Sequence, residues 1–194
     1  TSIITYYAID DLQQKGQEAA GITSIYFDEE KKKKRYAYTK AEGLVLDVFS
    51  DHKVLTDVLK GDTAIGHNRY STTGSSRRAN IQPFNMIYSG GILSIAHNGN
   101  LTNTVSLRKK LQDDGSIFQT TTDTELFLHL IARSKEETQI EQVREALRKA
   151  RGAYSLAIVT ENSLIAARDP FGVRPMSIGR MKTEQGWAYI VASE

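Results

Sequence analysis

The chain of 194 residues contains no cysteine. A disulfide framework, a thiolate zinc site and an iron–sulfur site are therefore excluded within these residues. A cysteine nucleophile is excluded for the same reason, so covalent chemistry within the chain would need another side chain. Proline is also scarce, with three residues, and two of them lie in the short segment Asp169–Pro175.

No apolar run approaches the length of a membrane span, and no signal peptide is visible. The charges nearly balance, since 25 Lys and Arg oppose 23 Asp and Glu for a net charge of +2. That balance argues against nucleic acid or an anionic membrane as the main partner. We therefore expect a cytoplasmic protein with no nucleic-acid or membrane partner. Because the first residue is Thr1 rather than methionine, we also expect that an N-terminal piece is missing.

Hydrophobic residues make up 40% of the chain, which is enough for a sizeable core. Apolar periodicity and turn residues predict the order of elements. Helices are expected at residues 6–14, 50–61 and 102–115, and from residues 122 and 138 onward. Strands are expected at residues 22–27, 36–39, 64–69, 91–96, 153–160, 164–168, 176–179 and 187–192. Runs of strands separated by a run of helices favour an α+β fold with antiparallel sheets sandwiched by helices.

Two of the expected helices begin with a capping-box pattern, in which Thr is followed three residues later by Glu. The pattern occurs at Thr122–Glu125 and again at Thr138–Glu141. Each predicts that the Thr side chain accepts a hydrogen bond from the backbone N–H of the Glu.

The basic run Lys31–Arg35 has two interpretations, a phosphate or nucleic-acid patch or a solvated hairpin tip. The run is short and directly follows three acidic residues. We therefore interpret it as the polar tip of a hairpin.

Arg69 stands at the end of an expected strand, in the segment Gly66–Gly74. Hydroxyl side chains follow it in a loop rich in Ser, Thr and Gly, and Thr72 is one of them. A planar guanidinium can hold a carboxylate through two parallel hydrogen bonds, so this segment is a candidate anion site. The alternative is that Arg69 pairs with an acidic side chain of the chain itself.

The segment Ala96–Asn100 follows another expected strand and contains Asn98 and Gly99. Asn-Gly is a strong signal for a tight hairpin turn, which is the plain interpretation. The next expected element is a helix, however, and not a partner strand. The side-chain amide of Asn98 and the backbone N–H of Gly99 could therefore converge on one point, as an oxyanion hole requires.

Asp123 lies in the first turn of the helix expected after Thr122. A carboxylate is favourable near any helix N-terminus, and the alternative is that it holds the ammonium group of a ligand. His67 and His97 could act as metal ligands or bases. We interpret both as structural, because the 4 histidines include no closely spaced pair.

Together these segments resemble one family over nearly the whole chain. The segment 12–22 looks like LQHRGQE-AGI, and the segment 65–74 is similar to GHxRYSTxG. Further motifs follow in the family's order at 82–84, 96–103, 121–125, 151–154, 168–175 and 191–194. The family is the class II glutamine amidotransferases, whose N-terminal-nucleophile hydrolase fold is a four-layer αββα sandwich. Within it, Arg-Tyr-Ser-Thr and His-Asn-Gly-Asn most resemble the amidophosphoribosyltransferases.

The resemblance implies that residues 1–194 form the glutaminase domain of such a protein, with a phosphoribosyltransferase domain expected after residue 194. Ammonia from glutamine would pass to that domain and convert phosphoribosyl pyrophosphate to 5-phosphoribosylamine, the first step of de novo purine synthesis. No cofactor is expected in the glutaminase domain, and magnesium would belong to the phosphoribosyltransferase domain. The resemblance implies a homo-oligomer at full length and leaves an iron–sulfur cluster there open.

The resemblance also assigns roles to site residues. An N-terminal cysteine would attack the side-chain amide of glutamine, with its own α-amino group as the base. Asn98 and the backbone N–H of Gly99 would hold the oxyanion. The α-carboxylate of glutamine would bind Arg69 with help from Thr72, and its α-ammonium group would bind Asp123.

Two departures from the family pattern matter. The pair Gln14-Lys15 replaces the usual His-Arg, which keeps the charge but loses the fork of donors. The nucleophilic cysteine, which in the family opens a strand before the Tyr6-Tyr7 segment, is absent. Thr1 is a poor substitute, because it runs directly into the first expected helix. We therefore expect a chain that is N-terminally truncated and inactive as given.

Two alternatives stay open at this point. One is the glutaminase domain of glutamine:fructose-6-phosphate aminotransferase, which more typically shows Arg-Trp-Ala-Thr and His-Asn-Gly-Ile. The other is a non-catalytic protein that retains a glutamine pocket. The sequence beyond residue 194 would distinguish the first alternative, and a full-length sequence without the cysteine would favour the second.

Overall fold

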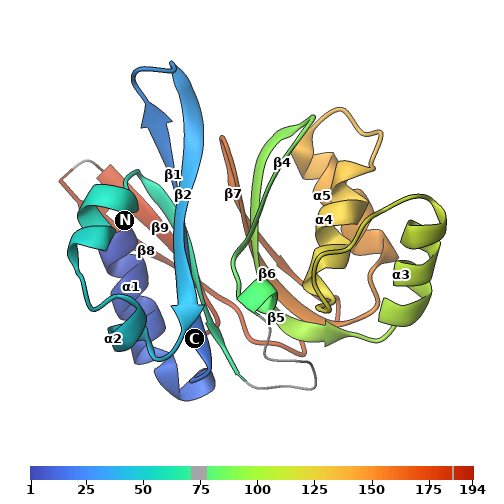
Figure 1. The fold of residues 1–194 in the computed structure, drawn as a ribbon, viewed down its shortest axis with the longest axis horizontal. Helices are drawn as coiled ribbons and strands as arrows, with labels where there is room; N and C mark the ends of the chain where they lie inside the picture. Colours follow the sequence, from blue (N-terminus) through green and yellow to red (C-terminus); the bar gives the residue numbers. More distant parts are fainter. Residues whose placement is uncertain (71–77, 185) are drawn as a thin grey trace.

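The computed structural model describes residues 1–70, 78–184 and 186–194, and these form four layers (Figure 1). The helices are α1 (Ser2–Asp11), α2 (Val45–Val48), α3 (Thr104–Asp113), α4 (Thr124–Ala132) and α5 (Gln139–Lys149). Helices α1 and α2 cover one sheet, a second sheet faces it, and the other three helices cover the far side of the second sheet. All strand pairs among the described residues are antiparallel. The expected αββα sandwich is confirmed.

The first sheet has three strands in the order β2-β1-β3. They are β1 (Ala19–Asp28), β2 (Lys33–Glu42) and β3 (Thr63–Arg69). The central strand β1 is apolar and almost wholly buried, whereas the edge strand β2 is polar and half exposed. Tyr6 of α1 and Phe49 after α2 pack against the outer face of this sheet, which fixes the two helices on it.

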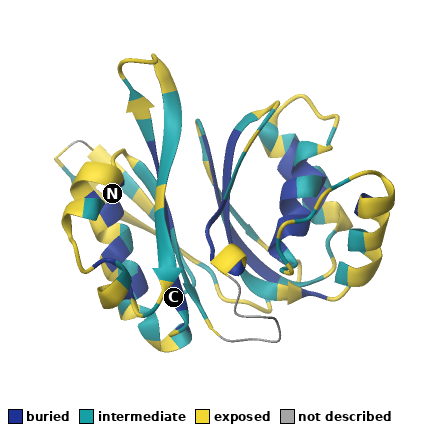
Figure 2. Cartoon of the chain, in the orientation of Figure 1, coloured by how far each residue is buried: buried dark blue, intermediate teal, exposed yellow. Residues whose placement is uncertain are grey.

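The second sheet has four strands in the order β4-β5-β6-β7. They are β4 (Phe84–Tyr88), β5 (Gly91–Leu101), β6 (Gly152–Thr160) and β7 (Leu164–Arg168). The central strands β5 and β6 and helix α4 supply the largest cluster of buried side chains, which Figure 2 shows in dark blue. A smaller apolar cluster, which includes Ile65 of β3 and Ile92 and Ala96 of β5, joins the two sheets. This packing therefore fixes strands β3 and β5 relative to each other.

A separate hairpin of β8 (Ser177–Thr183) and β9 (Gly186–Ala192) follows the second sheet. Its side chains are largely exposed, and Arg180 lies over the ring of Trp187 at 4.6 Å. No helix among the described residues is long and apolar enough to cross a membrane.

The run Lys31–Arg35 lies at the tip of the β1–β2 hairpin, which projects beyond the rest of the molecule (Figure 1). Lys32 pairs with Glu29 at 3.0 Å and Arg35 pairs with Asp28 at 3.3 Å. The run is thus exposed and partly neutralised by its own acidic neighbours, so the interpretation as a solvated tip is confirmed.

The helix expected at residues 50–61 is present but shorter. It is a five-residue π-helix, Val54–Val58, and the short helix α2 precedes it. Leu55 of this π-helix and Leu59 directly after it are already buried in the cluster with Tyr6, so a longer helix is not needed to cover them. The first helix also begins at Ser2 rather than at residue 6.

One of the two capping boxes was wrong. Helix α4 begins at Thr124, and the carboxylate of Glu125 accepts hydrogen bonds from the backbone N–H groups of Gln119 and Thr120, each at 2.8 Å. Glu125 therefore ties down the preceding loop instead of its own helix start. At the other box, Thr138 accepts from the backbone N–H of Glu141 at 3.3 Å, as expected.

Candidate active site

The Asn98-Gly99 pair lies within strand β5 and not in a turn. Strand β5 continues through this pair to Leu101, and Gly99 is paired with Tyr154 of β6. A Cβ at Gly99 would lie 2.1 Å from the carbonyl oxygen of Ala153, and the φ of Gly99 is 154°. Glycine is therefore required here by the close approach of β6. The plain interpretation as a hairpin turn is excluded.

Asn98 is half-buried at the end of this strand. Within the described part of the chain, its side-chain amide makes no hydrogen bond, so its donors are available to a ligand. A strand end with an uncommitted amide beside a backbone constrained by glycine is suited to hold a developing negative charge.

Asp123 is linked to this strand end by two contacts. Its Oδ2 accepts a hydrogen bond from the backbone N–H of Leu101 at 2.8 Å, and its Oδ1 lies 3.5 Å from Nδ1 of His97. Burial opposes the charge on Asp123, but the hydrogen bond and charge of His97, together with the Leu101 N–H, hold the pKa of the carboxyl below its usual value. Asp123 is therefore an ionised carboxylate beside the Asn98-Gly99 strand, as a ligand for an ammonium group must be.

Arg69 ends strand β3, and its Nε lies 3.8 Å from Oε2 of Glu18. Arg69 therefore has an acidic neighbour within the chain, as the alternative interpretation of this residue requires. The contact is longer than a hydrogen bond, and within the described residues this oxygen of Glu18 has no hydrogen-bond partner. A loose pair of this kind holds the side chain in place and leaves the guanidinium able to bind a carboxylate.

The two histidines connect the sheets at this point. Nε2 of His67 on β3 lies 3.1 Å from the carbonyl oxygen of His97 on β5, and Nδ1 of His97 lies 3.0 Å from Oγ1 of Thr124. Since a carbonyl oxygen only accepts hydrogen bonds, His67 must carry its proton on Nε2. No group of three or more acidic or histidine side chains that could hold a metal ion occurs among the residues described.

A family model described as a glutamine amidotransferase domain matches residues 67–194. The chain is 46% identical over 193 residues to amidophosphoribosyltransferase 2, chloroplastic, of Arabidopsis thaliana, a match that covers 100% of this chain and 33% of that protein. It is 42% identical over 176 residues to an amidophosphoribosyltransferase of Lacticaseibacillus casei, with 91% and 87% covered. The chain belongs to the glutamine amidotransferase family. The relatives place it among the amidophosphoribosyltransferases.

A solved structure described as the allosteric regulatory enzyme of purine biosynthesis agrees with this membership. It superposes with a TM-score of 0.88 at 41% identity, and the match covers 100% of this chain and 39% of that one. This glutamine amidotransferase chain therefore spans about a third of the length of the Arabidopsis relative and somewhat more of the solved one.

Of the residues assigned from the sequence, Asn98 and Gly99 lie on β5, Asp123 accepts from the backbone N–H of Leu101 at the end of the same strand, and Arg69 ends a strand of the facing sheet. Thr72 lies outside the described residues. Lys15, which departs from the family pattern, pairs with Glu194 at 2.5 Å. The positive charge that Lys15 keeps in place of the usual arginine is therefore used in an ion pair.

Sequence reasoning missed two residues that form hydrogen bonds to the backbone of the segments carrying the site residues. Gln82 and Asn80 are both buried and bond to the segments that carry Asn98 and Asp123. The motif Gln82–Phe84 was recognised as part of the resemblance, but its chemistry had no visible role. The only signal in the sequence was the amide side chain of Gln82 directly before Pro83.

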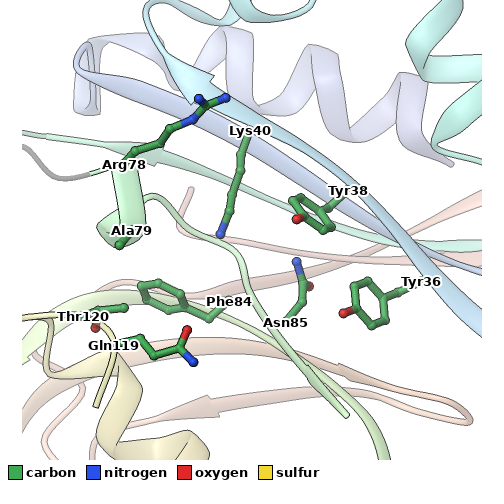
Figure 3. A pocket seen from close by; sticks show the side chains of 9 residues that line it. All are labelled: Tyr36, Tyr38, Lys40, Arg78, Ala79, Phe84, Asn85, Gln119 and Thr120. Atoms are coloured by element: carbon green, nitrogen blue, oxygen red, sulfur yellow. The ribbon is translucent and has the colours of Figure 1, made fainter. Parts of the chain in front are cut away.

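A cavity of about 260 Å³ opens between β2 and β4, and none of Arg69, Asn98 and Asp123 lines it (Figure 3). The side chain of Lys40 reaches into it from β2, between the rings of Tyr38 and Phe84. Burial lowers the pKa of Lys40 to about 8. The cavity thus adjoins the motif residue Phe84 but does not include the residues assigned to glutamine binding.

We predict that His67→Gln reduces the loss of stability at acid pH. Burial, opposed by the hydrogen bond to His97, lowers the pKa of His67 from 6.5 to about 4, so the folded protein keeps this ring neutral where the unfolded chain protonates it. The neutral ring contributes stability above pH 6.5, and that contribution is lost as the pH falls toward 4. Urea unfolding at pH 7.5 and pH 4.5 should therefore show about 2–3 kcal/mol less destabilisation in His67→Gln than in the wild type. Equal losses in both proteins would contradict a neutral His67.

Proposed function

We propose that this chain is the glutaminase half of an amidophosphoribosyltransferase. The observation that carries the proposal is the bond from the Leu101 N–H to Asp123, which fixes an ionised carboxylate beside the Asn98-Gly99 strand end. Family membership and the position of Arg69 at the end of β3 support the same interpretation. The relatives described above favour this assignment over the sugar-phosphate aminotransferase alternative.

In the proposed reaction, Asp123 binds the α-ammonium group of glutamine and Arg69, with Thr72, binds its α-carboxylate. The side-chain carbonyl then lies against Asn98 and the N–H of Gly99. A cysteine thiolate attacks the amide carbon, and the negative charge develops on the carbonyl oxygen between these two donors. The tetrahedral intermediate collapses with a proton transferred to the leaving nitrogen and releases ammonia. Water then hydrolyses the thioester to glutamate.

The attacking cysteine is not among the 194 residues, so we propose that it is supplied by a segment preceding Thr1. A test form of the chain, in which an N-terminal segment that begins with cysteine precedes Thr1, is called the cysteine-first form below. Thr1 is the N-cap residue of helix α1, and this helix lies in the outer layer of the sandwich, on the far side of the first sheet from the second (Figure 1).

The remaining steps of the whole enzyme are also part of the proposal. Ammonia passes to a phosphoribosyltransferase domain and displaces pyrophosphate from phosphoribosyl pyrophosphate, and magnesium serves that domain. A homo-oligomer and a cytoplasmic location stay predictions, and the Arabidopsis relative is named as chloroplastic.

Calorimetric titration of the 194-residue chain with glutamine analogues tests the binding half of this proposal. L-Glutamine should bind weakly but saturably. N-Acetylglutamine, which lacks the ammonium group, and glutamine methyl ester, which lacks the carboxylate, should each bind at least about tenfold more weakly, since a charge-assisted bond contributes ~1.5–3 kcal/mol. Equal affinity for all three compounds would remove Asp123 and Arg69 from the proposed site.

We predict that Asp123→Asn weakens glutamine binding at least about tenfold with little loss of stability. Asparagine can still accept the hydrogen bond from the Leu101 N–H, so only the charge is removed. The helix-terminus contribution of that charge is about 0.3–1 kcal/mol. Asp113→Asn, at the exposed end of α3, is the matched control. A large drop in melting temperature with unchanged glutamine affinity would make Asp123 a helix-capping residue only.

A further inference from the structure

The short segment from Asn80 to Pro83 contacts both halves of the proposed site. Gln82 grips His97, the residue before Asn98, with both ends of its side-chain amide. Its Oε1 accepts from the backbone N–H of His97 at 2.7 Å, and its Nε2 donates to the carbonyl oxygen of His97 at 3.2 Å. Both residues are buried, so neither group of the His97 backbone has water as a substitute partner.

The Gln82 amide takes the place of a strand. Strand β4 pairs with β5 from Phe84 opposite Ile95 onward, and the same register extended by two residues would set Gln82 opposite His97. At that position the side chain supplies the donor and the acceptor that a backbone would supply. Strand β5 is thereby held on both edges at the residue that precedes the oxyanion pair, because Leu156 of β6 lies on its other side.

Asn80 makes the equivalent grip on the segment that leads to Asp123. Its Nδ2 donates to Oγ1 of Thr121 at 2.9 Å, and its Oδ1 accepts from the backbone N–H of Thr121 at 3.1 Å. Asn80 is almost fully buried. One short segment thus binds the chain on both sides of the proposed glutamine site, two residues before Asp123 and one residue before Asn98.

The segment is itself anchored to the first sheet. The ammonium group of Lys40 on β2 donates to the carbonyl oxygens of Ile81 at 2.7 Å and Pro83 at 3.0 Å, which flank Gln82. On β1, a Cβ at Gly21 would lie 2.2 Å from the carbonyl oxygen of Gln82, so glycine lets the segment lie against this strand. The segment that carries Asn80 and Gln82 is therefore held in place by contacts with the first sheet.

We propose that Gln82 and Asn80 are positioning residues, Gln82 for the oxyanion pair Asn98-Gly99 and Asn80 for the ammonium-binding Asp123. This inference rests on the proposed function and assigns a different kinetic effect to each amide. Loss of the Gln82 grip should displace donors that act in the transition state and lower kcat. Loss of the Asn80 grip should displace a ground-state contact and raise KM for glutamine.

The first arm of the test uses the 194-residue chain and measures amide hydrogen exchange by NMR. Gln82→Met removes both bonds to His97 and keeps the side-chain length, and the His97 carbonyl retains the contact with His67. Exchange at the His97 N–H should accelerate at least about tenfold, while the Thr121 N–H stays protected. Asn80→Leu removes both bonds to Thr121 and should do the reverse, and Asn80→Ala, which also removes both, replaces it if the leucine variant does not fold. The control is Gln112→Met, on an exposed turn of α3.

The second arm uses the cysteine-first form and measures glutamate release. Gln82→Met should lower kcat about 10–100-fold with KM changed less than about threefold, since complete loss of one oxyanion donor costs about 10²–10³. Asn80→Leu, or Asn80→Ala in its place, should mainly raise KM. Unchanged exchange and kinetics, or equal losses of kcat, KM and melting temperature in both variants, would overturn the proposal. A wild-type form without glutaminase activity would refute the proposed function instead, and the exchange data would still decide whether the two amides hold the strands.

Discussion

Asn98→Ala in the cysteine-first form should lower kcat for glutamine hydrolysis about 10²–10³-fold and change KM much less. The side-chain amide of Asn98 makes no hydrogen bond in the described part of the chain, so its donors are available to the carbonyl oxygen of the proposed substrate. The bond to a carbonyl oxygen strengthens as negative charge develops on it, which places the loss in the transition state rather than in binding.

The matched control is Asn100→Ala, because Asn100 lies two residues along the same strand with an exposed side chain. It should leave kcat and KM within about twofold of the wild type, because substitution of an exposed side chain that makes no buried contact has a small effect. Normal turnover in Asn98→Ala would return the Asn98-Gly99 pair to a purely structural role in β5.

Arg69→Ala should lower kcat/KM for glutamine at least about tenfold and spare ammonia-dependent synthesis in a protein that also carries the phosphoribosyltransferase domain. A charge-assisted pair with the α-carboxylate contributes ~1.5–3 kcal/mol, and free ammonia does not use it. The measurement is a comparison of the two activities at saturating phosphoribosyl pyrophosphate.

The neighbouring Glu18 separates this role from a structural one. If Arg69 serves mainly to pair with Glu18, Glu18→Gln and Arg69→Ala should lower the melting temperature alike and reduce both activities together. We expect instead that Glu18→Gln has the smaller effect on glutamine use, since the 3.8 Å contact is too long for a strong bond.

The sequence predicted the sandwich because its motifs coincide with strongly patterned elements. β5 and β6 are near-continuous apolar strands, and α5 has a capping Thr138 at its start. Strand β4, of five residues, was missed, and one of its apolar residues, Ile87, is exposed. The capping box at Thr122 failed because Glu125 finds two backbone donors in the loop before the helix, which local pattern cannot show.

The site was predictable to the same extent. Arg69, Asn98 and Asp123 stand in motifs with a recognisable chemistry, and the structure bonds Asp123 to Leu101 at the end of the strand that carries Asn98. The supporting amides of Asn80 and Gln82 could not be assigned, because their partners His97 and Thr121 are brought to them only by the register of the folded sheet. A single sequence does not reveal a hydrogen bond whose partners are brought together only by the pairing of distant strands.

Glutamate release from L-glutamine, measured side by side for the 194-residue chain and its cysteine-first form, decides whether the chain lacks its nucleophile. We expect no release above the uncatalysed rate from the 194-residue chain at any pH, because it contains no cysteine to attack the amide carbon. We expect hydrolysis by the cysteine-first form and none by the same form with serine in place of the first cysteine. Release by the unmodified chain that Thr1→Ala abolishes would instead make Thr1 the nucleophile.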